Sequence, residues 1–176
     1  MKNSKNILKS LWKFIIKIQM KGQVIPVSNE QYLELIEELD LHINNEIEEL
    51  DKLDALAEKV TQENDGMPHA SGTSDKVGNI AVKIVMKQHD INEIIDLLID
   101  LRDEIIVQIK KLPIDEYDVL YKYYVVGMSL FDIADKRNKS DTWVKEKKKS
   151  GIRHIKINES DTYRKVLKIL FQSDRK

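Results

Sequence analysis

The chain has 176 residues, contains no cysteine and carries a formal net charge of −1 at pH 7. This length is sufficient for a buried core, and a content of 34% charged residues predicts a large solvated surface. The absence of cysteine excludes disulfides, thiol catalysis and cysteine-ligated zinc, and it fits a reducing compartment. No apolar run approaches the roughly 20 residues that span a bilayer, and no segment resembles a secretory signal, so the sequence predicts a cytoplasmic protein.

The small net charge hides a strong segregation of charge along the chain. Residues 1–28 contain six lysines and no acid, residues 29–104 contain 20 acids and six bases, and residues 135–156 contain nine bases and three acids. The local net charges are therefore +6, −14 and +6. An acidic segment cannot lie along a polyanion, so this pattern directs any nucleic acid to the C-terminal third.

Residues 1–28 form a separate basic segment, in which residues 5–18 have the spacing of an amphipathic helix. Lysines recur every four residues, and apolar residues are available on the opposite side. Such a helix can lie on an anionic membrane or in the groove of a partner protein. It can equally pack on the acidic part of the chain, or be an upstream extension if translation starts at Met20. These alternatives stay open.

Residues 29–112 are predicted to form two long helices. The first runs from about Glu30 to Thr61 and has apolar residues on one side, namely Leu33, Ile36, Leu39, Ile43, Ile47, Leu50, Leu53, Leu56, Ala57 and Val60. In the second, branched aliphatic residues recur every seven residues, at Val77, Ile84, Ile91, Leu98, Ile105 and Leu112, with Ile80, Ile94 and Leu101 between them. This heptad pattern is typical of a coiled-coil seam.

The segment between these helices has the composition of a loop. It contains Gly66, Pro68 and Gly72, Ser74 is expected to cap the second helix, and Pro113 is expected to mark its end. A short connection between helices of similar length predicts a long antiparallel helical hairpin. A parallel dimer through the same heptads is the competing packing.

Residues 113–176 are predicted to contain a helix-turn-helix. An apolar stripe marks the first helix, at Tyr117, Leu120, Tyr121, Tyr124 and Val125, and Gly127 ends it. Ser129 and Asp132 resemble a capping box before a short helix with Leu130, Ile133 and Ala134 on its buried face. Asn138 occupies the turn, since asparagine tolerates positive φ, and Ser140 caps the third helix. A last amphipathic helix after Ser160, with Tyr163, Val166, Leu167, Leu170 and Phe171, is expected to cover this core.

The third helix carries the predicted contacts with DNA. Side chains in its first turns reach base edges when such a helix enters the major groove, which assigns base readout to Thr142, Lys145, Glu146 and Lys149. Basic residues further round the helix or beyond the turn are expected to contact phosphates, namely Lys136, Lys139, Lys148 and Arg153. The alternative is that this basic helix is only a solvated surface.

A set of residues with family-like spacing runs through residues 29–157. It consists of Met67-Pro68, residues 74–78 (Ser-Asp-Lys-Val-Gly), Tyr124, Gly127, Ser129, Ile133-Ala134, Ser140 and Trp143-Val144. Through these residues the chain resembles the ArpU/RinA-type regulators of phage late operons, whose C-terminal part is similar to region 4 of sigma-70 factors. Capping by Ser74 and close packing at Gly78 are the expected roles of residues 74–78. Arg137 and Lys147 depart from the family, because they replace apolar residues. Gly151 is also unusual, since glycine is unfavourable within a helix.

No catalytic or cofactor-binding constellation is present. The four histidines lack the spacing of metal ligands, and the six glycines form neither a dinucleotide fingerprint nor a phosphate loop. The sequence therefore predicts no enzyme, no cofactor and no metal.

The prediction is an all-α protein in which an acidic hairpin precedes a DNA-binding helix-turn-helix. The resemblance implies a sequence-specific transcription regulator, an activator of phage late genes that acts with host RNA polymerase in the bacterial cytoplasm or nucleoid. The hairpin is then available for homodimerisation or for the polymerase. Two alternatives remain: a sigma-like polymerase-binding factor with weak DNA affinity of its own, and a coiled-coil assembly protein.

Overall fold

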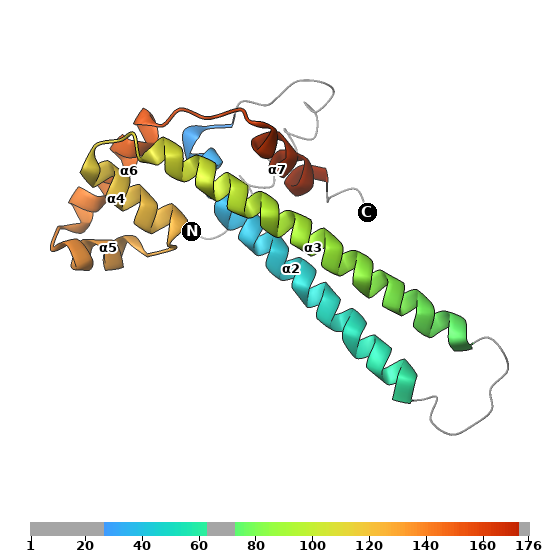
Figure 1. Ribbon diagram of the computed structural model, residues 1–176. Coiled ribbons are helices and arrows are strands. Elements are labelled where there is room, and N and C mark those ends of the chain that lie inside the picture. The colour runs from blue at the N-terminus through green and yellow to red at the C-terminus, as the bar shows by residue number, and fades with distance from the viewer. Residues whose placement is uncertain (1–26, 63–72, 173–176) are drawn as a thin grey trace. The chain divides into compact units, whose positions relative to one another are not determined.

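The computed structural model describes residues 27–62 and 73–172, and every regular element in this part of the chain is a helix (Figure 1). The elements are α2 (Asn29–Gln62), α3 (Thr73–Ile109), α4 (Ile114–Leu120), the π-helix η1 (Tyr121–Val125), α5 (Leu130–Arg137), α6 (Asp141–His154) and α7 (Asp161–Gln172). The all-α prediction is confirmed. The basic helix predicted at residues 5–18 lies outside the described residues. Of the helices that are described, none combines the length and the apolar character needed to cross a membrane.

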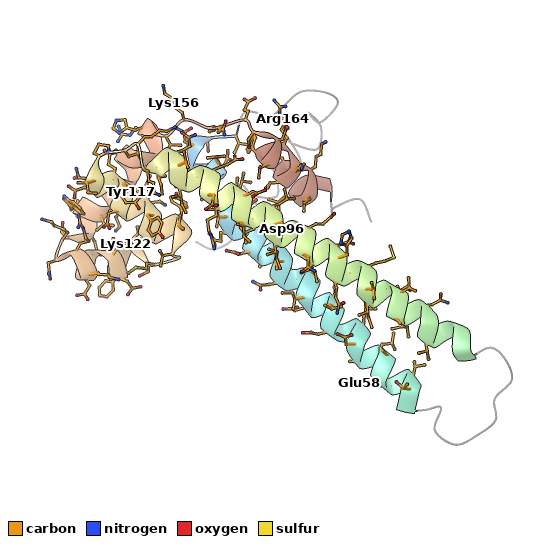
Figure 2. All side chains as sticks on the ribbon, viewed as in Figure 1. Glu58, Asp96, Tyr117, Lys122, Lys156 and Arg164 are labelled. Carbon is orange, nitrogen blue, oxygen red and sulfur yellow. The ribbon has the colours of Figure 1, made fainter. Side chains whose placement is uncertain are left out.

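The contacts divide the chain into two compact units. Of the described residues, the first unit contains 27–36 and 101–172, and the second unit contains 37–62 and 73–100. Both α2 and α3 contribute to each unit. The second unit is the acidic one, and charged side chains such as Glu58 and Asp96 are exposed on its surface (Figure 2).

In the second unit, α2 and α3 lie side by side. Buried aliphatic residues come from both helices, namely Leu39 and Ile43 from α2 and Ile91, Ile94 and Leu98 from α3. Lys87 takes the heptad position between Ile80 and Ile94, and its ammonium lies 2.5 Å from Glu46 and 2.6 Å from Glu49 of α2. Burial alone would lower the pKa of Lys87, but its hydrogen bonds to the two carboxylates outweigh burial and raise the pKa. Of the heptad residues in this unit, Ile91, Ile94 and Leu98 are thus buried within one chain.

The predicted apolar face of α2 is wider than the seam that α3 covers. Ile47 and Leu56 were expected on the buried side, but they are 38% and 47% exposed. A seam between two helices covers a narrow stripe, so apolar residues at its edges stay in contact with water. On α3, Val77, Ile80 and Ile84 are only half-buried.

The helix ends of α3 differ from the predicted ones. The helix begins at Thr73, which places Ser74 inside its first turn, and it ends at Ile109, so Leu112 lies outside it. The amides of Lys111 and Leu112 bond to the carbonyls of Gln108 and Ile109 in a tighter turn. Close packing at Gly78 was also a wrong expectation, since an added Cβ there would have no atom within 4 Å.

In the first unit, α7 packs on the beginning of α2 and the end of α3. The rings of Tyr163 and Tyr32 meet edge to face with centroids 5.7 Å apart. The Ser160 hydroxyl donates to Glu104 of α3 at 2.6 Å and accepts from the amide of Tyr163 at 3.0 Å. Burial raises the pKa of both tyrosines to about 12. The expectation that α7 covers the helix-turn-helix core is therefore wrong, because its buried aromatic residue pairs with α2 instead.

A π-helix interrupts the helix predicted around residues 117–125. Val119 is fully buried although the predicted stripe omits it, whereas Tyr117, Tyr121 and Tyr124 are half-buried. Val119 lies in α4 at ordinary helical spacing from the buried Glu116, so the predicted stripe was placed one residue too late in this helix. The π-helix follows α4 and turns by i to i+5 bonding. The amide of Val126 bonds to the carbonyl of Tyr121 at 3.0 Å in this pattern. Gly127 then ends the segment with φ of 78°, as predicted.

Candidate nucleic-acid interface

Local hydrogen bonds set the turn between α5 and α6. The Ser129 hydroxyl accepts from the amide of Asp132 at 3.1 Å and donates to its carboxylate at 2.6 Å. Asn138 adopts the left-handed conformation with φ of 51°, and the Ser140 hydroxyl accepts from the amide of Trp143 at 3.2 Å. The predictions for these two caps and for the turn residue are confirmed.

A small apolar core joins α4, α5 and α6. It consists of Val119, Ile133, Ala134 and Val144, against which Tyr123, Met128, Leu130 and Trp143 pack. Gly151 is buried where α6 approaches α4, and a Cβ added there would lie 2.8 Å from Cδ1 of Leu120 and 3.3 Å from Cβ of Glu116. The glycine that weakens α6 as an isolated helix is thus required by the close contact between the two helices.

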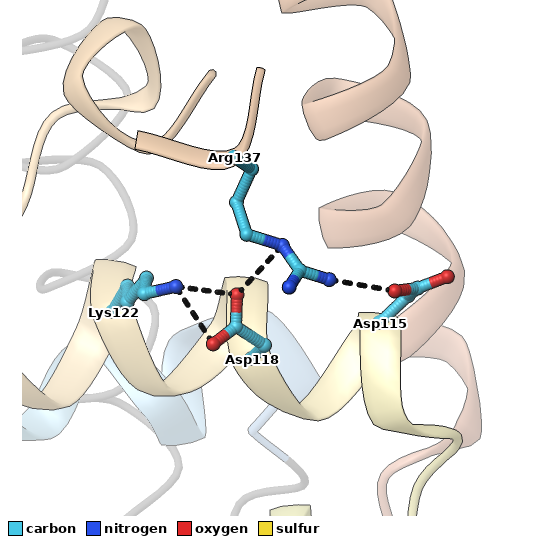
Figure 3. Close-up of polar contacts among 4 residues, drawn as sticks. All are labelled: Asp115, Asp118, Lys122 and Arg137. Carbon is cyan, nitrogen blue, oxygen red and sulfur yellow. Dashed lines mark hydrogen bonds and ion pairs between the residues drawn. The ribbon is translucent and has the colours of Figure 1, made fainter. Parts of the chain in front are cut away.

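Arg137 of α5 forms ion pairs with two carboxylates of α4 (Figure 3). Its Nη2 atom donates to Asp115 at 2.7 Å, and its Nε atom lies 3.2 Å from Asp118 in an ion pair without hydrogen-bond geometry. Lys122 donates to both oxygens of Asp118, at 2.7 and 2.6 Å. Arg137 therefore contacts α4 through ion pairs, because α4 supplies two acids within reach of its side chain.

A second polar contact joins α4 to α6. Glu116 is 5% exposed and accepts from the Ser150 hydroxyl at 2.8 Å, and the Nδ1 atom of His154 lies 2.8 Å from its other oxygen. Burial alone would raise the pKa of Glu116, but the hydrogen bonds with His154 and Ser150 and the charges of His154 and Lys147 outweigh burial and lower the pKa.

The lowered pKa of Glu116 predicts that its carboxylate stabilises the folded chain and that acid removes this stabilisation. Because the pKa in the folded chain lies below the ordinary 4.5, the carboxylate stabilises the fold above pH 4.5, and this stabilisation is lost as the pH falls through the folded pKa. Glu116→Gln should therefore lower the free energy of unfolding at pH 7, and the difference from the wild type should shrink below pH 4.5. Urea unfolding of both proteins from pH 7 to pH 3.5 measures this difference. A difference that does not change with pH contradicts the assignment.

The four predicted base-contacting residues share one exposed face of α6. Thr142, Lys145, Glu146 and Lys149 follow the i, i+3, i+4, i+7 spacing, and all four are exposed. The opposite face of the helix is buried at Val144 and Gly151. The structure therefore brings these four residues together on a surface that the core does not use.

The predicted phosphate-contacting residues differ in how far their side chains are exposed. Lys136, Lys139 and Arg153 are exposed. The side chain of Lys148 is 16% exposed, and its ammonium lies 4.1 Å from the ring centroid of Tyr123 and 3.4 Å from a carboxylate oxygen of Glu30. Within the folded chain, the ammonium of Lys148 therefore already contacts an aromatic ring and a carboxylate.

Three cationic side chains lie around the ring of Trp143, a cluster that the pattern of residues did not indicate. Arg137, Lys139 and Lys147 hold their charged groups 6.0, 5.6 and 5.8 Å from the centroid of its ring. Since Trp143 also packs on the core, its ring is held in place and borders a positively charged surface. The spacing of Lys147, four residues after Trp143, was the available sequence signal.

The first residue of α2 holds the end of α6. The side-chain amide of Asn29 donates to the carbonyls of Ile152 and Ile155, at 2.8 and 2.9 Å. Carbonyls at a helix C-terminus lack partners within the helix, so Asn29 supplies bonds that α6 cannot make for itself. The sequence separation of more than 120 residues explains why the pattern of residues did not indicate this contact.

No cluster of three or more metal-ligating side chains occurs among the residues that the structure describes. The chain matches no curated protein and no solved structure. Residues 1–112 match the family model described as "Origin of replication binding protein". The matched part contains α2 and α3 and ends before α4. Because this match covers more than half of the 176 residues, the chain belongs to the family that this model describes.

Proposed function

We propose that the protein binds double-stranded DNA in a sequence-specific manner and regulates transcription, with α5 and α6 as a helix-turn-helix. The observation that supports this proposal most directly is the exposed face of Thr142, Lys145, Glu146 and Lys149 on a helix whose opposite face is buried. Capped helices on both sides of the left-handed Asn138 hold that face away from the core. A recognition helix in the major groove needs these same properties.

The proposed architecture is a long antiparallel hairpin of α2 and α3 followed by the helix-turn-helix domain. The ion pairs of Lys87 with Glu46 and Glu49 support the pairing of the two helices. The acidic charge of residues 29–104 disfavours contact of the hairpin with DNA, so we assign it to a protein partner, either a second copy or host RNA polymerase. Activation of phage late genes is the role that the resemblance to ArpU/RinA-type regulators implies.

The family match favours a second candidate function, binding to an origin of replication. The description of the family names this activity, and the match includes α2 and α3. Both candidates require DNA recognition and differ in the DNA that is bound. A sigma-like polymerase-binding factor and a coiled-coil assembly protein are the remaining alternatives.

Binding to DNA fragments from the source genome separates these functions. The purified full-length chain is mixed with the fragments, and the bound DNA is sequenced. Promoter fragments support the regulator and origin fragments support the replication protein. Titration of a random duplex across a salt series comes first, because steep salt dependence is expected of any protein that neutralises phosphates. Absence of DNA binding at low salt would overturn the proposal and favour the assembly protein.

Lys145→Ala should weaken binding to the selected DNA by about 1–3 kcal/mol and relax the preference at one base pair. Lysine at this position is expected to donate to guanine, and alanine cannot replace that bond. Glu146 is expected to accept from cytosine, so Glu146→Ala should relax the preference at a neighbouring position. Competition binding with single base-pair variants of the site measures both effects.

Lys139→Ala is the matched control for phosphate contact. It should weaken binding to all sequences alike and lower the slope of log affinity against log salt concentration by roughly one. If Lys145→Ala and Lys139→Ala reduce specific and random binding by the same factor, then α6 holds DNA by charge alone and does not read sequence.

A further inference from the structure

An exposed apolar patch lies on α3 opposite its buried seam. Val82, Val85 and Met86 are 58%, 64% and 61% exposed, and their i, i+3, i+4 spacing places them on one face of the helix. From Ile80 to Met86, Lys83 is the only polar residue. A helical segment that is apolar on all sides is usually buried on all sides. Among the residues that the structure describes, α2 covers one side of this segment and nothing covers the other.

Two side chains of opposite charge border the patch. Lys83 and Asp90 are seven residues apart, which is about two turns, so they lie along the same edge of α3. Both are exposed, and neither forms an ion pair with another side chain in residues 27–62 or 73–172. An apolar centre with a charged rim has the composition of a protein interface.

We propose that Val82, Val85 and Met86 form the contact surface for a second copy of this chain, with the two α3 helices antiparallel. A twofold axis that passes between residues 86 and 87 places Met86 beside its own copy. The same axis places Lys83 of each copy beside Asp90 of the other, which forms the ion pair twice. A parallel arrangement sets residues of equal number side by side, and Lys83 then has no Asp90 opposite it. Charge complementarity therefore selects the antiparallel dimer.

The dimer uses the face of α3 that the heptad seam leaves free, so each chain keeps its own pairing of α2 with α3. In this register Val85 and Met86 lie near their own copies, whereas Val82 lies opposite His89 and Glu93 of the other chain, which pair with each other at 3.5 Å. The apolar contact is therefore small compared with the roughly 800 Å² per partner of a stable complex. We therefore expect a reversible dimer whose population rises with protein concentration. The inference concerns self-association and stands whether or not α6 binds DNA.

Disulfide cross-linking of the full-length chain tests the contact directly, because the natural sequence contains no cysteine. Met86→Cys provides one thiol per chain near the axis, and Ile99→Cys provides an exposed thiol on the same helix away from the patch. Under mild oxidation, Met86→Cys should give a disulfide-linked dimer at least about tenfold faster than Ile99→Cys. Equal rates, or faster linkage at residue 99, would overturn the proposal.

Sedimentation equilibrium tests the register of the two helices. Met86→Asp should raise the dissociation constant of the dimer about tenfold or more, because it places a charge in the apolar centre. Lys83→Glu should raise the constant several-fold at low salt, and Lys83→Glu combined with Asp90→Lys should return it to the wild-type value. Circular dichroism of each variant shows that the fold is kept. A wild-type protein that stays monomeric up to about 0.5 mM, or a dimer that is insensitive to Met86→Asp, would overturn the proposal.

Deletion of residues 1–26 distinguishes a second copy from the basic N-terminal segment as the occupant of the patch. The proposal expects dimerisation and Met86→Cys cross-linking to be unchanged by the deletion. If the shortened chain dimerises much more strongly than the full-length chain, the N-terminal segment covers the patch and the proposal is wrong for the whole protein.

Discussion

Ile91→Asp should lower the free energy of unfolding by about 3–5 kcal/mol, which is the cost of an unpaired charge in an apolar interior. Ile91 is 5% exposed and lies in the heptad seam between the two helices of the second unit. Small proteins are stable by only about 5–15 kcal/mol, so the variant should lose much of its cooperative unfolding. Thermal and urea unfolding followed by circular dichroism at 222 nm measure the effect.

Ile99→Asp is the matched control for Ile91→Asp. It makes the same substitution in the same helix, but Ile99 is 53% exposed and its carboxylate would stay hydrated. We expect a change within about 0.5 kcal/mol. If the two variants unfold at the same urea concentration as the wild type, then the heptad seam does not stabilise the fold. Equal destabilisation of both would show instead that charge itself, rather than burial, is the cause.

Gly151→Ala should destabilise the first unit although alanine is the better helix former. Replacement of a helical glycine normally gains up to about 1 kcal/mol. At position 151 the new Cβ would lie 2.8 Å from a methyl carbon of Leu120, which is fully buried and has little room to move. Overpacking of this kind costs about 1–3 kcal/mol, so the net change should be a loss of about 1 kcal/mol. Gly151→Leu should cost about 3 kcal/mol and separate α6 from α4.

Gly78→Ala should change the free energy of unfolding in the opposite direction. Gly78 also lies within a helix, but a Cβ added there meets no atom within 4 Å, so alanine should stabilise the protein by up to about 1 kcal/mol. Urea unfolding of the two alanine variants and the wild type settles the comparison. If Gly151→Ala were as stabilising as Gly78→Ala, the contact between α6 and α4 would be looser than the structure shows.

The parts of the fold that sequence predicted well depend on local chemistry. Ser129, Asn138 and Ser140 act on their own backbone or on residues three positions away, so each was recognisable without knowledge of the packing. The long helices were equally evident, since the periodicity of apolar residues extends over more than 30 positions in α2 and in α3. The exposed face of α6 followed from the cap at Ser140 and from helical spacing.

The parts that sequence did not predict depend on contacts between distant segments. Arg137 was noticed only as a departure from an apolar position, because its partners Asp115 and Asp118 lie about 20 residues earlier. The packing of α7 on α2 rests on the pair of Tyr163 and Tyr32, which no local pattern links. The burial of Val119 was missed because Tyr117, Tyr121 and Tyr124 form an equally regular stripe one residue away, and periodicity alone did not distinguish the two faces.

The uneven burial along α2 and α3 has a consequence for the motions of the second unit. Its buried aliphatic side chains are Leu39, Ile43, Ile91, Ile94 and Leu98. By contrast, the apolar side chains in residues 47–60 and 77–86 are half-buried or exposed. The free energy of local opening follows the apolar contacts that are lost, so the helix ends near the connecting segment should open by partial unfolding long before the rest. Their backbone amides would then exchange with solvent fastest, and the most protected amides would lie around Ile94 and Leu98.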